Sequence, residues 1–291
     1  MRKNLGQKPI SWVESMIVEF VSSSPENILG GSFKERAFDA PLVGVALGED
    51  PLFESMKQYV GPFHWTPLEI FRLHYPGEEV EARDLRVISW VLPQTEATRK
   101  DNRAQQVYPS ERWARARIFG EEFNDKIRRH VVSELEKRGY KALAPVLCPE
   151  FRRMESEKFV FASTWSERHA AFVAGLGTFG LCDGLITPLG KAVRLGSVVA
   201  CIDLTPSERS YTDHHEYCLF FSRATCGKCI PRCPVGALSP AGHDKRKCVA
   251  HLRPATRQYV QANYGFDGYG CGLCQTLVPC EEKIPAPQDG A

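Results

Sequence analysis

The chain has 291 residues, of which 43% are hydrophobic and 25% charged, and this composition excludes disordered and low-complexity proteins. Its 37 basic and 35 acidic residues leave a formal charge of +2, which is too small to indicate binding to nucleic acid or to an anionic membrane. The most apolar of the long uncharged stretches, 170–182, is shorter than a membrane span, and no apolar run follows the basic segment 1–9. We therefore expect a cytoplasmic protein.

Short apolar runs alternate with longer amphipathic segments from about residue 41 to residue 204, which is typical of a layered α/β structure. Buried strands are predicted at 42–47 and 87–92. The clearest helix prediction is 111–138, where apolar residues recur every four positions and form one stripe. This stripe consists of Phe119, Phe123, Ile127, Val131 and Leu135.

A second helix is predicted from Thr164, which forms a capping box with Glu167, to Gly175. The string Gly175-Leu-Gly177-Thr-Phe-Gly180 then matches the G-x-G-x-x-G fingerprint of dinucleotide-binding sites. A dinucleotide site needs these glycines between a strand and a helix, whereas here they follow a helix and precede a strand, so a nicotinamide dinucleotide is excluded. The glycines still indicate a close approach of the backbone, either to a flat cofactor or to another chain segment.

The 11 cysteines are unevenly distributed, because only Cys148, Cys182 and Cys201 precede residue 218. In a cytosolic chain, the dense C-terminal group indicates metal or redox chemistry more than disulfides. The segment Cys226-Gly-Lys-Cys229-Ile-Pro-Arg-Cys233-Pro234 reproduces the last three cysteines and the proline of the bacterial ferredoxin run. Arg223 occupies the place of the first ligand, so Cys218 is the predicted substitute.

Eight cysteines are enough for two 4Fe-4S clusters, and in the two-cluster pattern the fourth cysteine of the run binds the other cluster. One predicted ligand set is Cys218, Cys226, Cys229 and Cys280, and the other is Cys233, Cys248, Cys271 and Cys274. Structural zinc knuckles are the alternative to the clusters, and His214 or His215 is the alternative to Cys218. The segment 233–237 suits a tight turn into a short helix. The change in cysteine density places a domain boundary near Thr212.

Two stretches, Ser166 to Gly180 and Leu185 to Val199, resemble the corrinoid-binding core of epoxyqueuosine reductases. The segment with the eight C-terminal cysteines, 218–280, follows them in the same order and is called the cysteine-rich segment below. The resemblance covers roughly residues 87–280. It implies an α+β fold, with a nitroreductase-like α/β domain over 1–212 and a ferredoxin-like domain with two 4Fe-4S clusters over 213–291. Reductive dehalogenases are similar in joining these two domains.

The resemblance implies a reductase, in which an external ferredoxin or flavodoxin reduces the clusters and electrons pass to cobalamin and then to a small organic substrate. The residues that it places along or near the corrin are Gly175, Leu176, Gly177, Thr178, Phe179, Gly180, Leu185, Ile186, Thr187 and Pro188. The Asp-x-His-x-x-Gly cobalt-ligand motif of other corrinoid enzymes is absent, as in this family. No membrane partner is expected.

Three departures from the family narrow these expectations. Phe161 aligns with the proton-donating aspartate and cannot donate a proton, which disfavours epoxyqueuosine as the substrate. Five residues separate Cys274 from Cys280, and no proline follows, so the loop around Cys280 must differ. The chain ends 11 residues after Cys280, without the repeat domain that grips transfer RNA in some members, so nucleic acid is not an expected partner.

Two alternative functions remain. One is an electron-transfer or corrinoid-handling protein without a substrate of its own, and Phe161 favours it. The other is a reductase with FMN in place of the corrinoid, for which the available phosphate-binding residues are Arg115, Arg117 and Arg194. Substitute proton donors are Tyr108, His169 and Tyr211, although each is more commonly a packing residue. Cys182 is either a redox thiol or, more commonly, an inert buried cysteine.

Overall fold

The computed structural model describes residues 11–156 and 160–286, and the basic segment 1–9 lies outside them. Its centre is an antiparallel four-stranded sheet in the order β1-β2-β8-β3. The bounds are Leu42–Leu47 for β1, Leu85–Pro93 for β2, Val193–Cys201 for β8 and Ala142–Leu143 for β3. The predicted strand 42–47 is confirmed, and 87–92 lies within β2.

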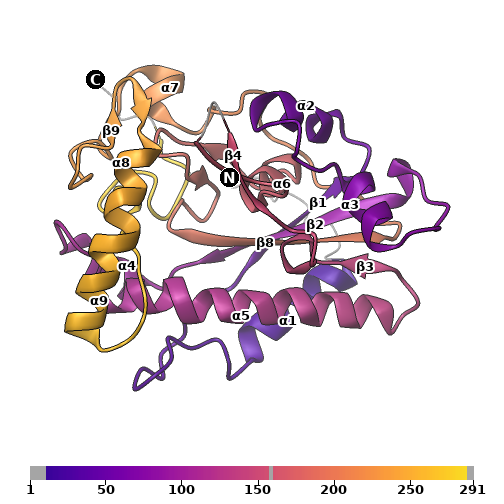
Figure 1. Ribbon diagram of the computed structural model, residues 1–291, viewed down its shortest axis with the longest axis horizontal. Helices are drawn as coiled ribbons and strands as arrows, with labels where there is room; N and C mark the ends of the chain where they lie inside the picture. The colour runs from indigo at the N-terminus through magenta and orange to yellow at the C-terminus, as the bar shows by residue number, and fades with distance from the viewer. Residues whose placement is uncertain (1–10, 157–159, 287–291) are drawn as a thin grey trace, which may run out of the picture.

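Two helices, α1 (Trp12–Ser23) and α5 (Glu111–Glu136), cover one face of this sheet (Figure 1). Four of the five predicted stripe residues, Phe123, Ile127, Val131 and Leu135, pack in one core with the sheet residues Ile88, Trp90 and Val198, whereas Phe119 is half-buried against Phe266. Burial of such side chains contributes about 1.5–3 kcal/mol each. The helix begins at the predicted residue, where the Ser110 Oγ accepts a hydrogen bond from the Trp113 amide, and it ends two residues before the predicted Arg138.

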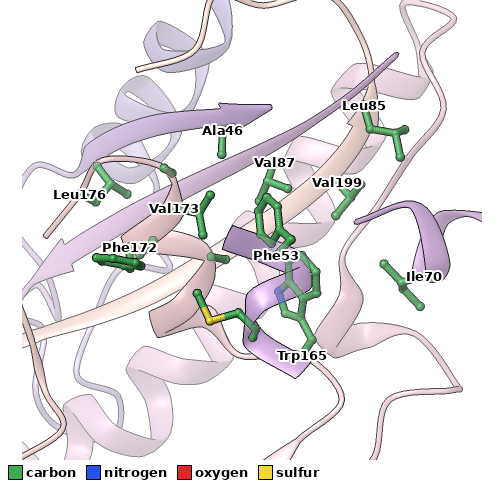
Figure 2. Packing of buried hydrophobic residues seen from close by; sticks show 14 of the residues in the cluster. Ala46, Phe53, Ile70, Leu85, Val87, Trp165, Phe172, Val173, Leu176 and Val199 are labelled. Carbon is green, nitrogen blue, oxygen red and sulfur yellow. The ribbon is translucent and has the colours of Figure 1, made fainter. Parts of the chain in front are cut away.

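Three helices, α2 (Pro51–Tyr59), α3 (Pro67–His74) and α6 (Glu167–Val173), cover the opposite face. Figure 2 shows Phe53 and Trp165 packed beneath Val87 and Val199 of the sheet. The two cores give a mixed helix-and-sheet structure, as the sequence predicts. Its description as nitroreductase-like stays a prediction.

Helix α6 begins later than predicted. Its N-cap is Ser166, and the Oγ1 of Thr164 instead accepts a hydrogen bond from the Arg152 amide at 3.1 Å. Glu167 does not complete a capping box, because its Oε1 lies 3.0 Å from Nη2 of Arg128. Arg128 is 2% exposed, and a buried guanidinium requires such a partner.

The remaining elements lie between and after the strands of this sheet, and the C-terminal ones form the cysteine-rich segment, which lies beside α4 and the start of α5 at one end of the molecule (Figure 1). They are α4 (Glu96–Arg103), η1 (Ala82–Asp84), η2 (Pro145–Leu147), β4 (Arg153–Ser156), β5 (Val160–Ser163), β6 (Thr178–Phe179), β7 (Leu185–Ile186), α7 (Leu219–Arg223), β9 (Leu238–Ser239), β10 (Gly242–His243), α8 (Lys245–Ala250), η3 (His251–Ala255), α9 (Thr256–Tyr264) and η4 (Leu273–Gln275). Within the described residues, no helix is long and apolar enough to span a bilayer.

Polar contacts fix the cysteine-rich segment to the rest of the chain. Nε of Arg103 donates to Oε1 of Glu281 at 2.8 Å, and Nδ2 of Asn102 donates to the carbonyl of Cys271 at 3.2 Å. Gly272 also lies against Trp113, where a Cβ atom would meet the indole at 1.9 Å. The segment is therefore packed against α4 and α5. The boundary at Thr212 stays a prediction.

Candidate metal centre

Four predicted ligands line one cavity, namely Cys218, Cys226, Cys229 and Cys280. Cys218 caps the N-terminus of α7, and the next two cysteines follow this helix. Burial raises the pKa of Cys229 to about 12, and the nearby thiols of Cys280 and Cys218 act in the same direction. The structure thus brings the first predicted ligand set together around one space.

The other four predicted ligands form a second group. Burial raises the pKa of Cys271 to about 11, and the neighbouring Cys248 and Cys233 act in the same direction. Cys274 follows on η4 and also interacts with Cys271. Cys271 therefore lies near the other three predicted ligands of its set. Their role as cluster ligands stays a prediction.

The turn after Cys233 supplies a hydrogen bond to its sulfur. The Ala237 amide lies 3.2 Å from the Cys233 Sγ, and amide donors of this kind tune the potential of a bound cluster. The tight turn over 233–237 is present, but the strand β9 follows it and not the predicted helix. The reason is that Leu238 pairs with His243 of β10.

A buried lysine lies among the thiols. Lys191 is 3% exposed, and its Nζ lies 3.4 Å from the Sγ of Cys182. Burial opposes its charge, but Cys182, Cys280, Cys274 and Cys229 together raise the pKa of Lys191 well above its usual range. The sequence analysis missed this residue, because its partners come from segments far apart in the chain.

Cys182 itself is a ninth cysteine at this site. It is 7% exposed and forms a hydrogen bond with Cys274, which lowers the pKa of Cys182 well below its usual range, and Lys191 acts in the same direction. Cys182 thus lies beside predicted ligands of both clusters. The structure makes it a neighbour of the predicted ligands, in addition to the two roles considered from sequence.

A second neighbour that the sequence analysis missed is His243. Its Nδ1 lies 2.9 Å from Oδ2 of Asp183, and it also forms a hydrogen bond with Cys248. Asp183 therefore orients an imidazole that contacts a predicted ligand, an arrangement common around metal sites. Asp183 lies three residues after the glycine string, so the string and the second cysteine group adjoin.

The glycine string packs against the chain itself. A Cβ atom at Gly177 would lie 2.2 Å from the Ile186 carbonyl oxygen, and one at Gly175 would lie 2.8 Å from the Glu208 carbonyl oxygen. The string follows α6 and contains β6, so it comes after a helix and leads into strands. This is the order of elements on which the dinucleotide site was excluded. Of the two explanations for these glycines, the structure therefore shows the approach of a chain segment.

Most residues expected along the corrin are buried in this packing. Seven of the ten are buried, two are half-buried, and Pro188 is exposed; the buried seven are Leu176, Gly177, Thr178, Gly180, Leu185, Ile186 and Thr187. A hydrogen bond joins this packed stretch to the residue before Cys218, because the Oγ1 of Thr178 accepts from the Tyr217 amide at 2.9 Å. In this conformation these residues do not offer a corrin an open face.

The structure places the candidate proton donors in packing roles and does not bring them together. Tyr108 stacks on Tyr259 with ring centroids 4.1 Å apart, and the Tyr211 hydroxyl donates to the Phe172 carbonyl. Burial lowers the pKa of His169 to about 3. Phe161, at the position of the family acid, is 45% exposed on β5.

The candidate phosphate-binding arginines already have partners. Arg115 donates to Glu111 at 2.8 Å, Arg117 donates to the Tyr269 hydroxyl at 2.8 Å, and Arg194 pairs with Glu121. Likewise, Nδ1 of His215 lies 2.8 Å from the Phe179 carbonyl oxygen. The FMN alternative would need these arginines to bind a phosphate, and the histidine alternative would need His215 to replace Cys218 as a ligand. In the structure these side chains already have other partners.

Sequence comparison supports the family resemblance. An epoxyqueuosine reductase from Bacillus anthracis is 32% identical over 132 residues, which cover 43% of this chain and 32% of that protein. Part of the chain is therefore similar to epoxyqueuosine reductases. The enzyme from Staphylococcus aureus (strain NCTC 8325 / PS 47) is 31% identical over 142 residues, covering 47% of this chain and 35% of that protein. Each match spans about a third of the relative's length, and no protein-family model matches the chain.

Solved structures support the fold. A selenomethionine-labelled epoxyqueuosine reductase matches 96% of this chain and 70% of its own, with 17% identity and a TM-score of 0.50. A catabolic reductive dehalogenase in complex with 3-bromo-4-hydroxybenzoic acid matches 94% of this chain and 36% of its own, with 14% identity and a TM-score of 0.51.

One epoxyqueuosine reductase was solved with a modified transfer-RNA stem loop, and it matches with 17% identity and a TM-score of 0.49 over 96% of this chain and 68% of its own. The bound RNA is a property of that protein. The expectation that this chain has no nucleic-acid partner is not confirmed.

Proposed function

We propose that this chain is an iron–sulfur reductase that passes electrons from an external low-potential donor through two 4Fe-4S clusters. The observation that carries the proposal is that four of the predicted ligand cysteines line one cavity, while Cys271 lies near Cys248 and Cys233. Thiolate sulfurs are the usual ligands of such clusters, which supply one-electron transfer when bound. The partial relationship to epoxyqueuosine reductases supports the same assignment.

The chain's own residues fit this role. Cys218, Cys226, Cys229 and Cys280 would hold one cluster, and Cys233, Cys248, Cys271 and Cys274 the other. The buried Lys191 would offset part of the negative charge of the bound clusters, and the Ala237 amide would stabilise one ligand sulfur. Structural zinc knuckles on the same cysteines are the alternative metal assignment.

A small organic substrate reached through cobalamin is the acceptor that the family resemblance supports. The packed glycine string does not fit a corrin in the present conformation, so we derive no step through that group. A second candidate is an electron-transfer or corrinoid-handling protein without its own substrate. Two observations favour it, namely the packing of Gly177 on Ile186 and an exposed phenylalanine, Phe161, where a proton donor is expected.

The test is an anaerobic titration of the iron-reconstituted protein with hydroxocobalamin, with iron and cobalt counted per chain after gel filtration. About eight irons and one retained cobalt are expected for a corrinoid-dependent reductase. About eight irons without cobalt would favour the electron-transfer candidate, and bound flavin absorption would favour the FMN alternative. Fewer than about four irons would contradict the proposal as a whole.

A further inference from the structure

A cluster of metal-ligating side chains lies at the opposite end of the molecule from the cysteine-rich segment. His74 is the last residue of α3, and Cys148 and Glu150 follow η2, just after β3. Figure 1 shows α3 and β3 far from α8 and α9. One ligand atom from each of these three residues lies within 4.8 Å of the other two. No step of the proposed electron transfer uses these residues.

The three side chains carry ligand atoms of the kinds that zinc binds. Nδ1 of His74 lies 3.8 Å from the Sγ of Cys148. Tetrahedral zinc, with bonds of about 2.3 Å to sulfur and about 2.0–2.1 Å to nitrogen, separates two such ligands by about 3.6 Å. The histidine and the cysteine are therefore already at nearly the spacing that zinc requires.

The charge and hydrogen bonding of these side chains also favour a bound cation. Cys148 is 8% exposed, and the Glu150 carboxylate is close enough to act on its thiol electrostatically. The Oε2 atom of Glu150 is buried and accepts no hydrogen bond in the described structure. A buried carboxylate oxygen without a donor is costly, and a divalent cation would satisfy it.

We propose that His74, Cys148 and Glu150 form a zinc site that joins the end of α3 to the turn after β3. Zinc binding displaces the proton of the Cys148 thiol to solvent, so that a thiolate, a neutral imidazole and a carboxylate bind the ion. Three protein ligands leave a fourth position for water. This proposal is independent of the proposed iron–sulfur function.

The test uses the full chain reconstituted anaerobically with iron and sulfide, so that the predicted cluster cysteines are occupied. The protein is then titrated with zinc sulfate against a chromophoric chelator, and zinc and iron are counted per chain by mass spectrometry. The variants are Cys148→Ser, Glu150→Gln and, as a matched thiol control, Cys201→Ser, which changes a half-buried cysteine on β8. Cobalt(II) replaces zinc in a parallel titration, because cobalt–thiolate charge-transfer absorption reports a cysteine ligand directly.

We expect the wild type and Cys201→Ser to bind one zinc in addition to iron. Cys148→Ser should weaken zinc binding by at least about 100-fold and abolish the cobalt–thiolate band, and Glu150→Gln should weaken it by at least about 10-fold, with iron unchanged in both. Glu150→Gln keeps the test valid if Cys148→Ser does not fold. Equal zinc affinity in the wild type, Cys148→Ser and Glu150→Gln would overturn the proposal, as would a wild type that binds no additional zinc. Iron counts measured in the same samples report separately on the iron–sulfur proposal.

Discussion

The ammonium group of Lys191 lies 3.4 Å from the Cys182 sulfur, and both side chains are buried beside predicted ligands of both clusters. The backbone amide of Lys191 also donates to the Cys280 carbonyl at 2.9 Å, so its position is fixed by the segment that carries a ligand. A fixed cation at a site shielded from water favours the more negative oxidation state of a neighbouring cluster.

Replacing this cation should therefore lower a cluster potential. We expect Lys191→Met to lower the midpoint potential of at least one cluster by about 60 mV, which is about a tenfold change in a one-electron equilibrium. Lys191→Arg retains the charge and should stay close to the wild type. The measurement is a redox titration followed by electron paramagnetic resonance. Identical potentials in the three proteins, at equal iron content, would show that Lys191 has no electrostatic role.

The packing of the glycine string predicts a large effect at Gly177. Gly177→Ala would place a Cβ atom 2.2 Å from the Ile186 carbonyl oxygen, and we expect it to reduce the free energy of unfolding by about 3 kcal/mol. Gly139→Ala is the matched control, because Gly139 also has a positive φ, but within the described residues no atom beyond its chain neighbours lies within 4 Å of its Cβ position. The control should lose only about 1 kcal/mol. Denaturant unfolding measures both, and equal losses would contradict the tight approach.

The sequence predicts the elements whose stabilising contacts are local or periodic. The helix α5 follows from one apolar stripe and a serine cap. The spacing of the ferredoxin run predicts candidate ligands, and four of these cysteines line one cavity. Long-range contacts are the reason for the errors. Glu167 pairs with Arg128 on α5 and does not complete the predicted capping box, and Leu238 pairs with β10 and does not continue a helix.

The same distinction applies to the candidate site. The role of Lys191 depends on thiols that lie up to 89 positions away along the chain at Cys280, and no spacing rule relates them. The glycine string indicates a close approach, but only the structure shows that Ile186 and Glu208 are the approaching groups. Residue type and spacing thus predict the candidate ligands, and tertiary packing determines their surroundings.

Two buried histidines predict acid sensitivity of the α/β core. Burial lowers the pKa of His64 to about 4, and both of its ring nitrogens lack hydrogen bonds in the described structure. Below the unfolded pKa of about 6.5, the unfolded chain binds a proton that the folded chain does not. The free energy of unfolding therefore decreases as the pH is lowered. The His169 ring centroid lies 5.9 Å from that of His64, and the lowered pKa of His169 should make the protein acid-sensitive in the same way.

The test compares the wild type with His64→Phe, which keeps an aromatic ring beside Trp165. Between pH 7.5 and pH 5.0 the wild type should lose about 2 kcal/mol more than the variant. The reason is that about 1.5 pH units of this interval lie below the unfolded pKa of His64 and above its folded pKa, and each unit contributes about 1.4 kcal/mol. Denaturant unfolding followed by tryptophan fluorescence gives both values. The same loss in both proteins would show that His64 does not cause the acid sensitivity.

The central claim, two 4Fe-4S clusters on two separate cysteine sets, is tested most directly by counting iron in single-cysteine variants. Cys229→Ala and Cys271→Ala should each contain about four irons per chain after reconstitution, against about eight in the wild type. Cys182→Ala and Cys201→Ala remove thiols outside the two sets and should keep about eight. Unchanged iron in Cys229→Ala and Cys271→Ala, or a loss of about four irons in Cys182→Ala, would contradict the ligand sets described here.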